Sequence, residues 1–151
     1  MSVTIKGLDK VLKDIESRGD KVQKAVITVL SETAQAIEFD AKTACPPDIL
    51  GVAISTKGRI TSRFEKGGLY WNVGINATED LDAYVEFSTG LDAARVLNGV
   101  GYTKEMRDIA IRFRKNGQGT LRGTPFLFPA YIKNTANLVK EIEKEIAQQI
   151  K

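Results

Sequence analysis

Histidine is absent from this chain of 151 residues, and cysteine occurs once, at Cys45. The lack of histidine excludes Ser-His-Asp and Cys-His catalysis, and it excludes zinc sites built on histidine or on several cysteines. A single cysteine also excludes a disulfide framework within the chain. Because free cysteine is mostly a packing residue, we expect Cys45 to be a small buried or half-buried side chain at a helix end and not a reactive thiol.

Long apolar runs are also missing. No stretch approaches the roughly 18–20 apolar residues that a membrane-spanning helix needs. The first residues, "MSVTIKGLDK", lack the basic-then-apolar order of a secretory signal. The formal net charge of +3 is too small to indicate a nucleic-acid binder by itself. These features predict a soluble protein made in the cytoplasm, with residues 1–151 as a single domain and no membrane contact.

Hydrophobic residues make up 42% of the chain, and their spacing first indicates helix. Residues 8–44 are expected to be helical, with a break at Gly19 and an N-cap at Asp20 for the longer second segment. Pro46-Pro47 is expected to end that segment. Its apolar stripe consists of Val22, Val26, Val29, Thr33, Ile37 and Ala41.

The period of the pattern changes to two after residue 58. Residues 59–64, 69–76 and 83–88 are predicted as three strands, with Lys66-Gly67-Gly68 as a hairpin turn between the first two. In the second strand, alternation places Trp71, Val73 and Ile75 on one face. We therefore expect a small antiparallel meander that offers one face to the long helix.

Residues 89–123 form a glycine-punctuated excursion, predicted as an extended loop that contains a short helix or strand within "TKEMRDIAIRFR". Seven basic and three acidic residues give this stretch +4, more than the whole chain carries. A solvated charged loop and a loop that faces a polyanion are both compatible with this charge. The basic residues are Arg95, Lys104, Arg107, Arg112, Arg114, Lys115 and Arg122.

The end of the chain, residues 129–150, is predicted as one helix that begins at Pro129, since proline suits a first helical turn. The fold class predicted from the whole pattern is α+β, with a long N-terminal helix and a C-terminal helix on a small antiparallel sheet. The apolar stripe of the last helix consists of Ile132, Ala136, Val139, Ile142, Ile146 and Ile150.

Carboxylates would have to carry catalysis in a chain without histidine. Glu79, Asp80 and Asp82 lie in a polar turn and are predicted to be solvated. Glu86 interrupts the apolar strand "AYVEFS", where alternation predicts an outward-facing side chain. A partner role toward a basic residue in the loop, or toward a neighbouring subunit, is the alternative for Glu86. No catalytic, cofactor or metal site is predicted, and the phosphate-binding glycine motifs are absent.

Four stretches together resemble the neck or tail-completion proteins of long-tailed bacteriophages. They are "IKGLDKVLKDIES", "AKTACPPD", "DAYVEFSTG" and "GTPFLFPAYIKNTANLVKEIEKEI", and they follow one another in the order found in that family. The resemblance covers most of the chain. The chain differs from the family pattern at Phe128, where the family favours arginine, and at Ser88, where the family has glycine.

This resemblance implies a structural, non-enzymatic protein of the virion, assembled in the host cytoplasm. It would form a ring with copies of itself at the head–tail junction, between connector or head-closure proteins and the tail terminator or tail tube. Genomic DNA would pass transiently through the ring. Basic side chains expected to face that channel are Arg107, Arg112, Arg114, Lys115 and Arg122. Residues expected at subunit interfaces are Glu86, Phe126, Phe128 and Tyr131.

The stretch "GTPFLFPAYIKN" is expected to leave the basic loop in extended form, with Pro125 and Pro129 holding the backbone. Two of its three apolar side chains should dock on the core, and Phe128 should be exposed to a neighbouring subunit. Two other functions stay open beside the neck protein. They are a tail terminator subunit and a small nucleic-acid-binding protein without sequence specificity.

Overall fold

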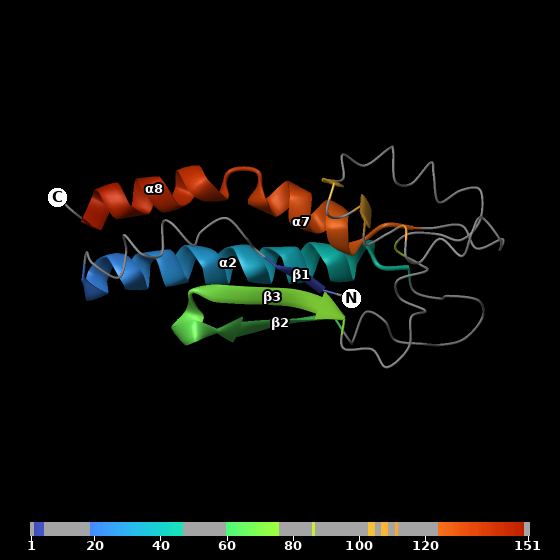
Figure 1. Ribbon diagram of the computed structural model, residues 1–151, viewed down its shortest axis with the longest axis horizontal. Helices are drawn as coiled ribbons and strands as arrows, with labels where there is room; N and C mark the ends of the chain where they lie inside the picture. The colour runs from blue at the N-terminus through green and yellow to red at the C-terminus, as the bar shows by residue number, and fades with distance from the viewer. Residues whose placement is uncertain are drawn as a thin grey trace.

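The part of the chain that the computed structural model describes contains the elements β1, α2, β2, η1, β3, α7 and α8, in this order (Figure 1). Expectations for residues 8–18 and for most of residues 76–123 lie outside the part of the chain that the structure describes. The described residues are 2–4, 19–46, 60–75, 86, 103, 104, 107, 108, 111 and 124–149.

Helix α2, Asp20–Ala44, confirms the long helix predicted from the apolar stripe. Asp20 is the first helical residue, so its expected role as N-cap is wrong. Gly19 holds that position with a φ of 92°, a left-handed value that glycine adopts without strain. The helix ends at Ala44, and its C-cap residue Cys45, just before the two prolines, is buried as expected. Its buried positions are Val22, Val26, Val29, Leu30, Thr33, Ala34, Ile37 and Ala41.

The predicted hairpin is confirmed by β2, Ile60–Glu65, and β3, Tyr70–Ile75, which pair antiparallel. The turn between them is the 3₁₀ segment η1, Lys66–Gly68. At Gly68 the φ is 92°, and a Cβ atom would stand 2.9 Å from a side-chain carbon of Ile27. Glycine is therefore required there both for its backbone conformation and for the close approach of the turn to α2.

Among the described residues the third strand of the sheet is β1, Ser2–Thr4, which the sequence pattern did not predict. The sheet order is β1-β3-β2, with Val3 opposite Val73. Of residues 83–88 the structure describes Glu86, which is helical, so the strand prediction is wrong at that residue. A short apolar run does not distinguish strand from helix by its period, because both conformations can bury it.

The C-terminal helix is confirmed, but it is two helices and not one. Helix α7, Leu127–Thr135, and helix α8, Leu138–Gln149, are separated by a turn at residues 136–137. The turn shifts the apolar register, because Leu138 is 4% exposed whereas Val139, part of the predicted stripe, is 56% exposed. Ile142 is buried as the stripe predicted.

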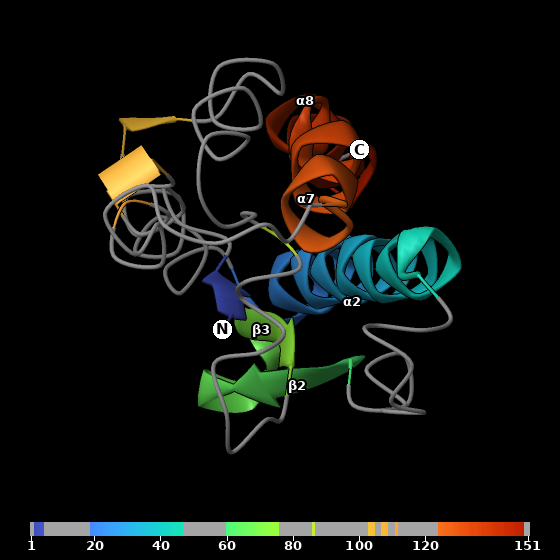
Figure 2. The ribbon, with the colours of Figure 1, turned by 90° about the vertical axis from the view of Figure 1, so that its right-hand side faces the viewer.

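The elements form three layers with α2 in the middle (Figure 1). Helices α7 and α8 run along one side of α2 in the opposite direction, and the β2–β3 hairpin lies along its other side (Figures 1 and 2). The buried side chains of these layers form one core, which includes Val73, Phe126 and Ile142. The α+β fold class, with an N-terminal and a C-terminal helix beside a small antiparallel sheet, is therefore confirmed. No helix among the described residues is long and apolar enough to cross a membrane.

The register of α8 can be tested with two neighbouring residues. Leu138→Ala should lower the free energy of unfolding by about 2–5 kcal/mol, because it leaves a cavity in the core. Val139→Ala should change it by less than about 0.5 kcal/mol, because that side chain is on the surface. Urea unfolding followed by circular dichroism measures both values. Equal losses at the two positions would contradict the observed register.

Candidate functional site

The carboxylate of Glu86 lies at the beginning of α7, where it is fully buried. Its oxygen Oε2 accepts hydrogen bonds from the backbone N–H groups of Phe126, at 2.7 Å, and Leu127, at 2.8 Å. Oxygen Oε1 accepts a third from the N–H of Phe128, at 3.0 Å. One side chain from the middle of the sequence thus binds three consecutive peptide groups some forty residues later.

This contact accounts for every donor at the start of α7. A helix leaves its first four N–H positions without a partner inside the helix. Here these positions are Phe126, which is the N-cap, and the next three residues. Glu86 binds the first three, and the fourth is Pro129, which has no N–H. The negative charge also faces the positive end of the helix dipole.

The local sequence explains why the cap comes from elsewhere. Phe126 has no side chain that can accept a hydrogen bond, so this N-cap residue makes no capping bond of its own. Helices usually satisfy these donors with Ser, Thr, Asp or Asn at the N-cap. The apolar tripeptide instead packs its side chains into the core, so the polar partner of its backbone has to be supplied by another segment.

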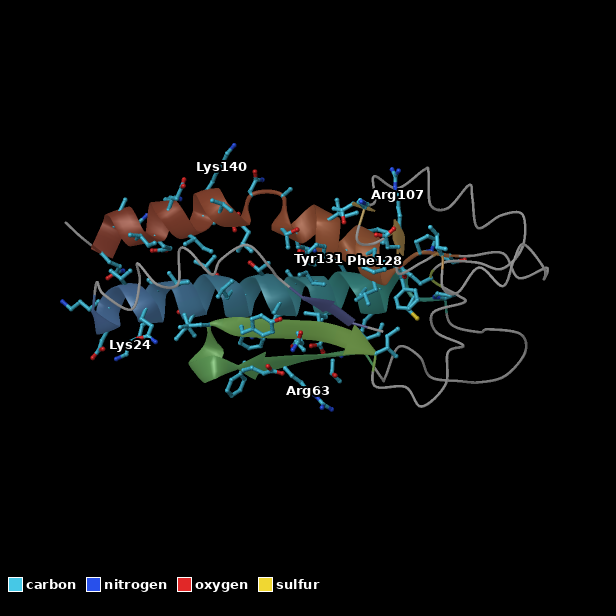
Figure 3. All side chains as sticks on the ribbon, in the orientation of Figure 1. Lys24, Arg63, Arg107, Phe128, Tyr131 and Lys140 are labelled. Atoms are coloured by element: carbon cyan, nitrogen blue, oxygen red, sulfur yellow. The ribbon has the colours of Figure 1, made fainter. Side chains whose placement is uncertain are left out.

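The three apolar residues of "PFLFP" are all buried. Phe126 and Leu127 are 0% exposed and Phe128 is 2% exposed, so the expectation that Phe128 is exposed to a neighbour is wrong. The reason is the helical turn: α7 begins at Leu127, before Pro129, and turns these side chains toward the core. Phe128 and Tyr131 lie between α7 and α2 (Figure 3).

The predicted interface residues therefore differ in what they can offer to a partner. Glu86, Phe126 and Phe128 are buried inside the chain and present almost no surface. The expectation of an outward-facing Glu86 is wrong for the same reason. Tyr131 is half-buried, and burial raises the pKa of its phenol. Among these four, Tyr131 alone keeps surface that a neighbouring subunit could contact.

Arg107 is the one predicted channel residue that the structure describes. It is exposed and helical, and its N–H donates to the carbonyl of Thr103 at 3.0 Å. Lys104 and Ile111, three residues before and four residues after Arg107, are also helical and exposed, and so is the adjacent Asp108. Figure 3 shows Arg107 near the α7 end of the molecule. Arg112, Arg114, Lys115 and Arg122 lie outside the described residues, as do Glu79, Asp80 and Asp82.

Two carboxylates from a single turn of α2 bind the layers on either side. Asp40 accepts hydrogen bonds from Lys133, at 2.8 Å, and from Asn134, at 2.9 Å, both on α7. Glu38 accepts hydrogen bonds from the N–H of Ser62, at 2.7 Å, and from its hydroxyl, at 2.5 Å, on β2. Sequence analysis missed these contacts because no local pattern connects residues so far apart.

The same hydrogen bonds change how these two carboxyl groups titrate. Bonds from Lys133 and then Asn134 hold the pKa of Asp40 below its ordinary value of 3.8. Partial burial raises the pKa of Glu38, but the bonds from Lys42 and Ser62 outweigh it and hold the pKa below 4.5. Among the described residues, no group of three His, Cys, Asp or Glu side chains is arranged to hold a metal ion.

The contribution of Glu86 can be measured by removing its carboxylate. Glu86→Ala should lower the free energy of unfolding by at least roughly 3 kcal/mol, because three buried N–H groups lose their acceptor. Glu86→Gln should recover little of the loss, since its amide offers one acceptor oxygen in place of two. Chemical unfolding monitored by circular dichroism provides the measurement.

A matched control for this experiment is Glu143→Ala, which removes an exposed carboxylate from α8 and should leave stability nearly unchanged. Formate or acetate provides a second control. Either anion should partly restore the stability of Glu86→Ala, because it can occupy the vacated acceptor position, and neither should stabilise Glu143→Ala. A Glu86→Ala protein as stable as the wild type would contradict the capping role.

Glu38 and Asp40 make the layer contacts sensitive to acid. Because their folded pKa values lie below the unfolded ones, both stabilise the fold above about pH 4.5 and lose this contribution as pH falls through the folded values. Glu38→Gln/Asp40→Asn should be less stable than wild type at pH 7, and the difference should shrink as the pH falls from 7 to well below 4.5. Urea unfolding across this range measures it, and a constant difference would contradict the assignment.

Searches with this chain against protein-family models, curated proteins and solved structures give no match. The resemblance to the neck and tail-completion family therefore stays a prediction from the four sequence stretches. The arrangement of the side chains described above is the structural observation that bears on function.

Proposed function

We propose that this chain is a non-enzymatic viral structural protein, a ring-forming subunit of the neck or tail-completion type at the junction of head and tail. In this role it joins the tail to the capsid and leaves a central passage for DNA. Its partners are copies of itself, the connector or head-closure protein, and the tail terminator or tail tube protein.

The observation that carries the proposal is the contact of Glu86 with residues 126–128. Glu86 belongs to "DAYVEFSTG", and its three backbone partners belong to "GTPFLFPAYIKN". These are two of the four stretches that resemble the family. Their resemblance thus coincides with a specific physical contact: one stretch supplies the carboxylate and the other supplies the helix start that needs it. Because two of the matching stretches contact each other, the pairing favours a shared architecture as the cause of the resemblance over four unrelated chance similarities.

The three-layer arrangement also suits a structural role. Polar contacts from one turn of α2 bind β2 on one side and α7 on the other, so the layers cannot slide past each other without breaking them. A subunit that transmits force between head and tail needs such rigidity. Lys104 and Arg107 are exposed, and basic side chains of this kind can bind a phosphate backbone without reading its sequence.

The proposal is tested in the genome that encodes the chain. Disruption of its coding sequence should give filled heads and separate tails in negative-stain electron micrographs, and the intact coding sequence supplied in trans should restore joined particles. Particles that remain joined without the protein would refute the proposal. The purified chain, mixed with the connector and tail-tube proteins from the same genome, should assemble on them as a ring.

The nucleic-acid-binding alternative gives a different result in solution. A sequence-independent binder should hold duplex DNA with an affinity that falls steeply with salt, and Arg112→Glu/Arg114→Glu/Lys115→Glu should reduce both the affinity and the salt slope. A passage for DNA should show weak affinity at every salt concentration. Tight binding of this kind, together with joined particles in the disrupted strain, would favour the alternative.

A further inference from the structure

Strand β2 is an edge of the sheet as far as the described residues extend, because the strand order is β1-β3-β2. The N–H of Ser62 donates to Glu38 on α2 and so points away from β3. In an antiparallel pair, the peptide groups of alternate residues point to opposite sides of the strand. The backbone groups of Ile60, Ser62 and Phe64 therefore face outward from the sheet edge.

Three consecutive side chains on this edge are exposed. Phe64 is 66% exposed, although its ring also contacts Trp71 on β3 with 5.7 Å between ring centroids. Arg63 and Glu65 are exposed and point to the opposite face of the strand, and Figure 3 shows Arg63 on the side of β2 away from the helices. An exposed edge strand with a large apolar side chain is a template for pairing with another strand.

We propose that β2 pairs antiparallel with β2 of a second copy of this chain, in a two-fold contact centred on Phe64. In this register the outward N–H and C=O groups of the two Phe64 residues bond to each other. Arg63 of each copy lies opposite Glu65 of the other, so the strand is complementary in charge to its own reversed sequence. The occupant of the edge is therefore another copy.

Glu38 decides between the possible registers. A contact centred on Ser62 would need the N–H that Glu38 already binds at 2.7 Å, and it would place Arg63 opposite Thr61 without an opposite charge. A contact centred on Arg63 would also need the N–H of Ser62 and would place the two Arg63 side chains opposite each other, and a contact centred on Glu65 would place the two Glu65 side chains opposite each other. The register centred on Phe64 is the one within β2 that meets the hydrogen-bonding and charge requirements together.

This contact is isologous, which means that it joins two copies and then is complete. It does not rest on the proposed ring, whose contacts must be head-to-tail and therefore use other surfaces. The paired segment is short, so we expect a weak dimer that forms as the protein concentration rises. Loss of the dimer would leave the head–tail proposal standing, and joined particles without the protein would leave the dimer standing.

Charge reversal tests the pairing with full-length protein. Sedimentation velocity of the wild type, up to about 1 mM, should show a monomer–dimer equilibrium. Arg63→Glu and Glu65→Arg should each weaken the association at least about tenfold, because both cross-strand pairs become repulsive. The double variant Arg63→Glu/Glu65→Arg should return to within about threefold of wild type, since both attractive pairs are restored.

A mixture of the two single variants is the most discriminating part of this experiment. Each single variant repels itself, but Arg63→Glu and Glu65→Arg are complementary to each other and should form a heterodimer when mixed. Lys140→Glu on α8 is the matched control, an exposed charge reversal that should leave dimerisation unchanged. Far-UV circular dichroism confirms that each variant is folded. A monomeric wild type at every concentration, or a double variant and a mixture no better associated than the single variants, would overturn the proposal.

Discussion

The structure depends on one buried carboxylate. Glu86 reaches the start of α7 and satisfies three peptide N–H groups that have no other partner within the helix. The contact allows an apolar tripeptide to begin a helix inside the core, where an uncapped helix start would cost several unsatisfied donors. Pro129 removes the fourth donor, so the helix start is complete with a single side chain. The burial of Phe126 and Phe128 follows from it.

Helix α2 connects the two outer layers of the molecule. Its apolar stripe supplies the central layer of the core, and its carboxylates Glu38 and Asp40 bind β2 and α7 with directional hydrogen bonds. Apolar packing holds the layers together without specifying their relative positions, whereas these hydrogen bonds do specify them. The result suits a subunit that presents defined surfaces to several neighbours, which is the role we propose.

The sequence predicted the elements whose stability is mostly local. The spacing of Val22, Val26 and Val29 predicted α2, and the glycines of the turn predicted the β2–β3 hairpin, since both patterns depend on neighbouring residues. It did not predict the turn that separates α7 from α8, or that Leu138 and not Val139 faces the core. It also missed β1 as the third strand, because three residues carry too little pattern to be recognised.

At the candidate site, the sequence alone revealed two unusual features: two prolines around an apolar tripeptide, and an acidic residue within an apolar segment. The sequence also excluded Ser-His-Asp and Cys-His catalysis and zinc sites built on histidine or on several cysteines, since the chain has no histidine and one cysteine. Only the tertiary structure showed that the acidic residue caps the helix that begins at the apolar tripeptide. Glu86 and Phe126 are 40 residues apart, and no periodicity spans that distance, because the interaction exists only after the chain has folded back on itself.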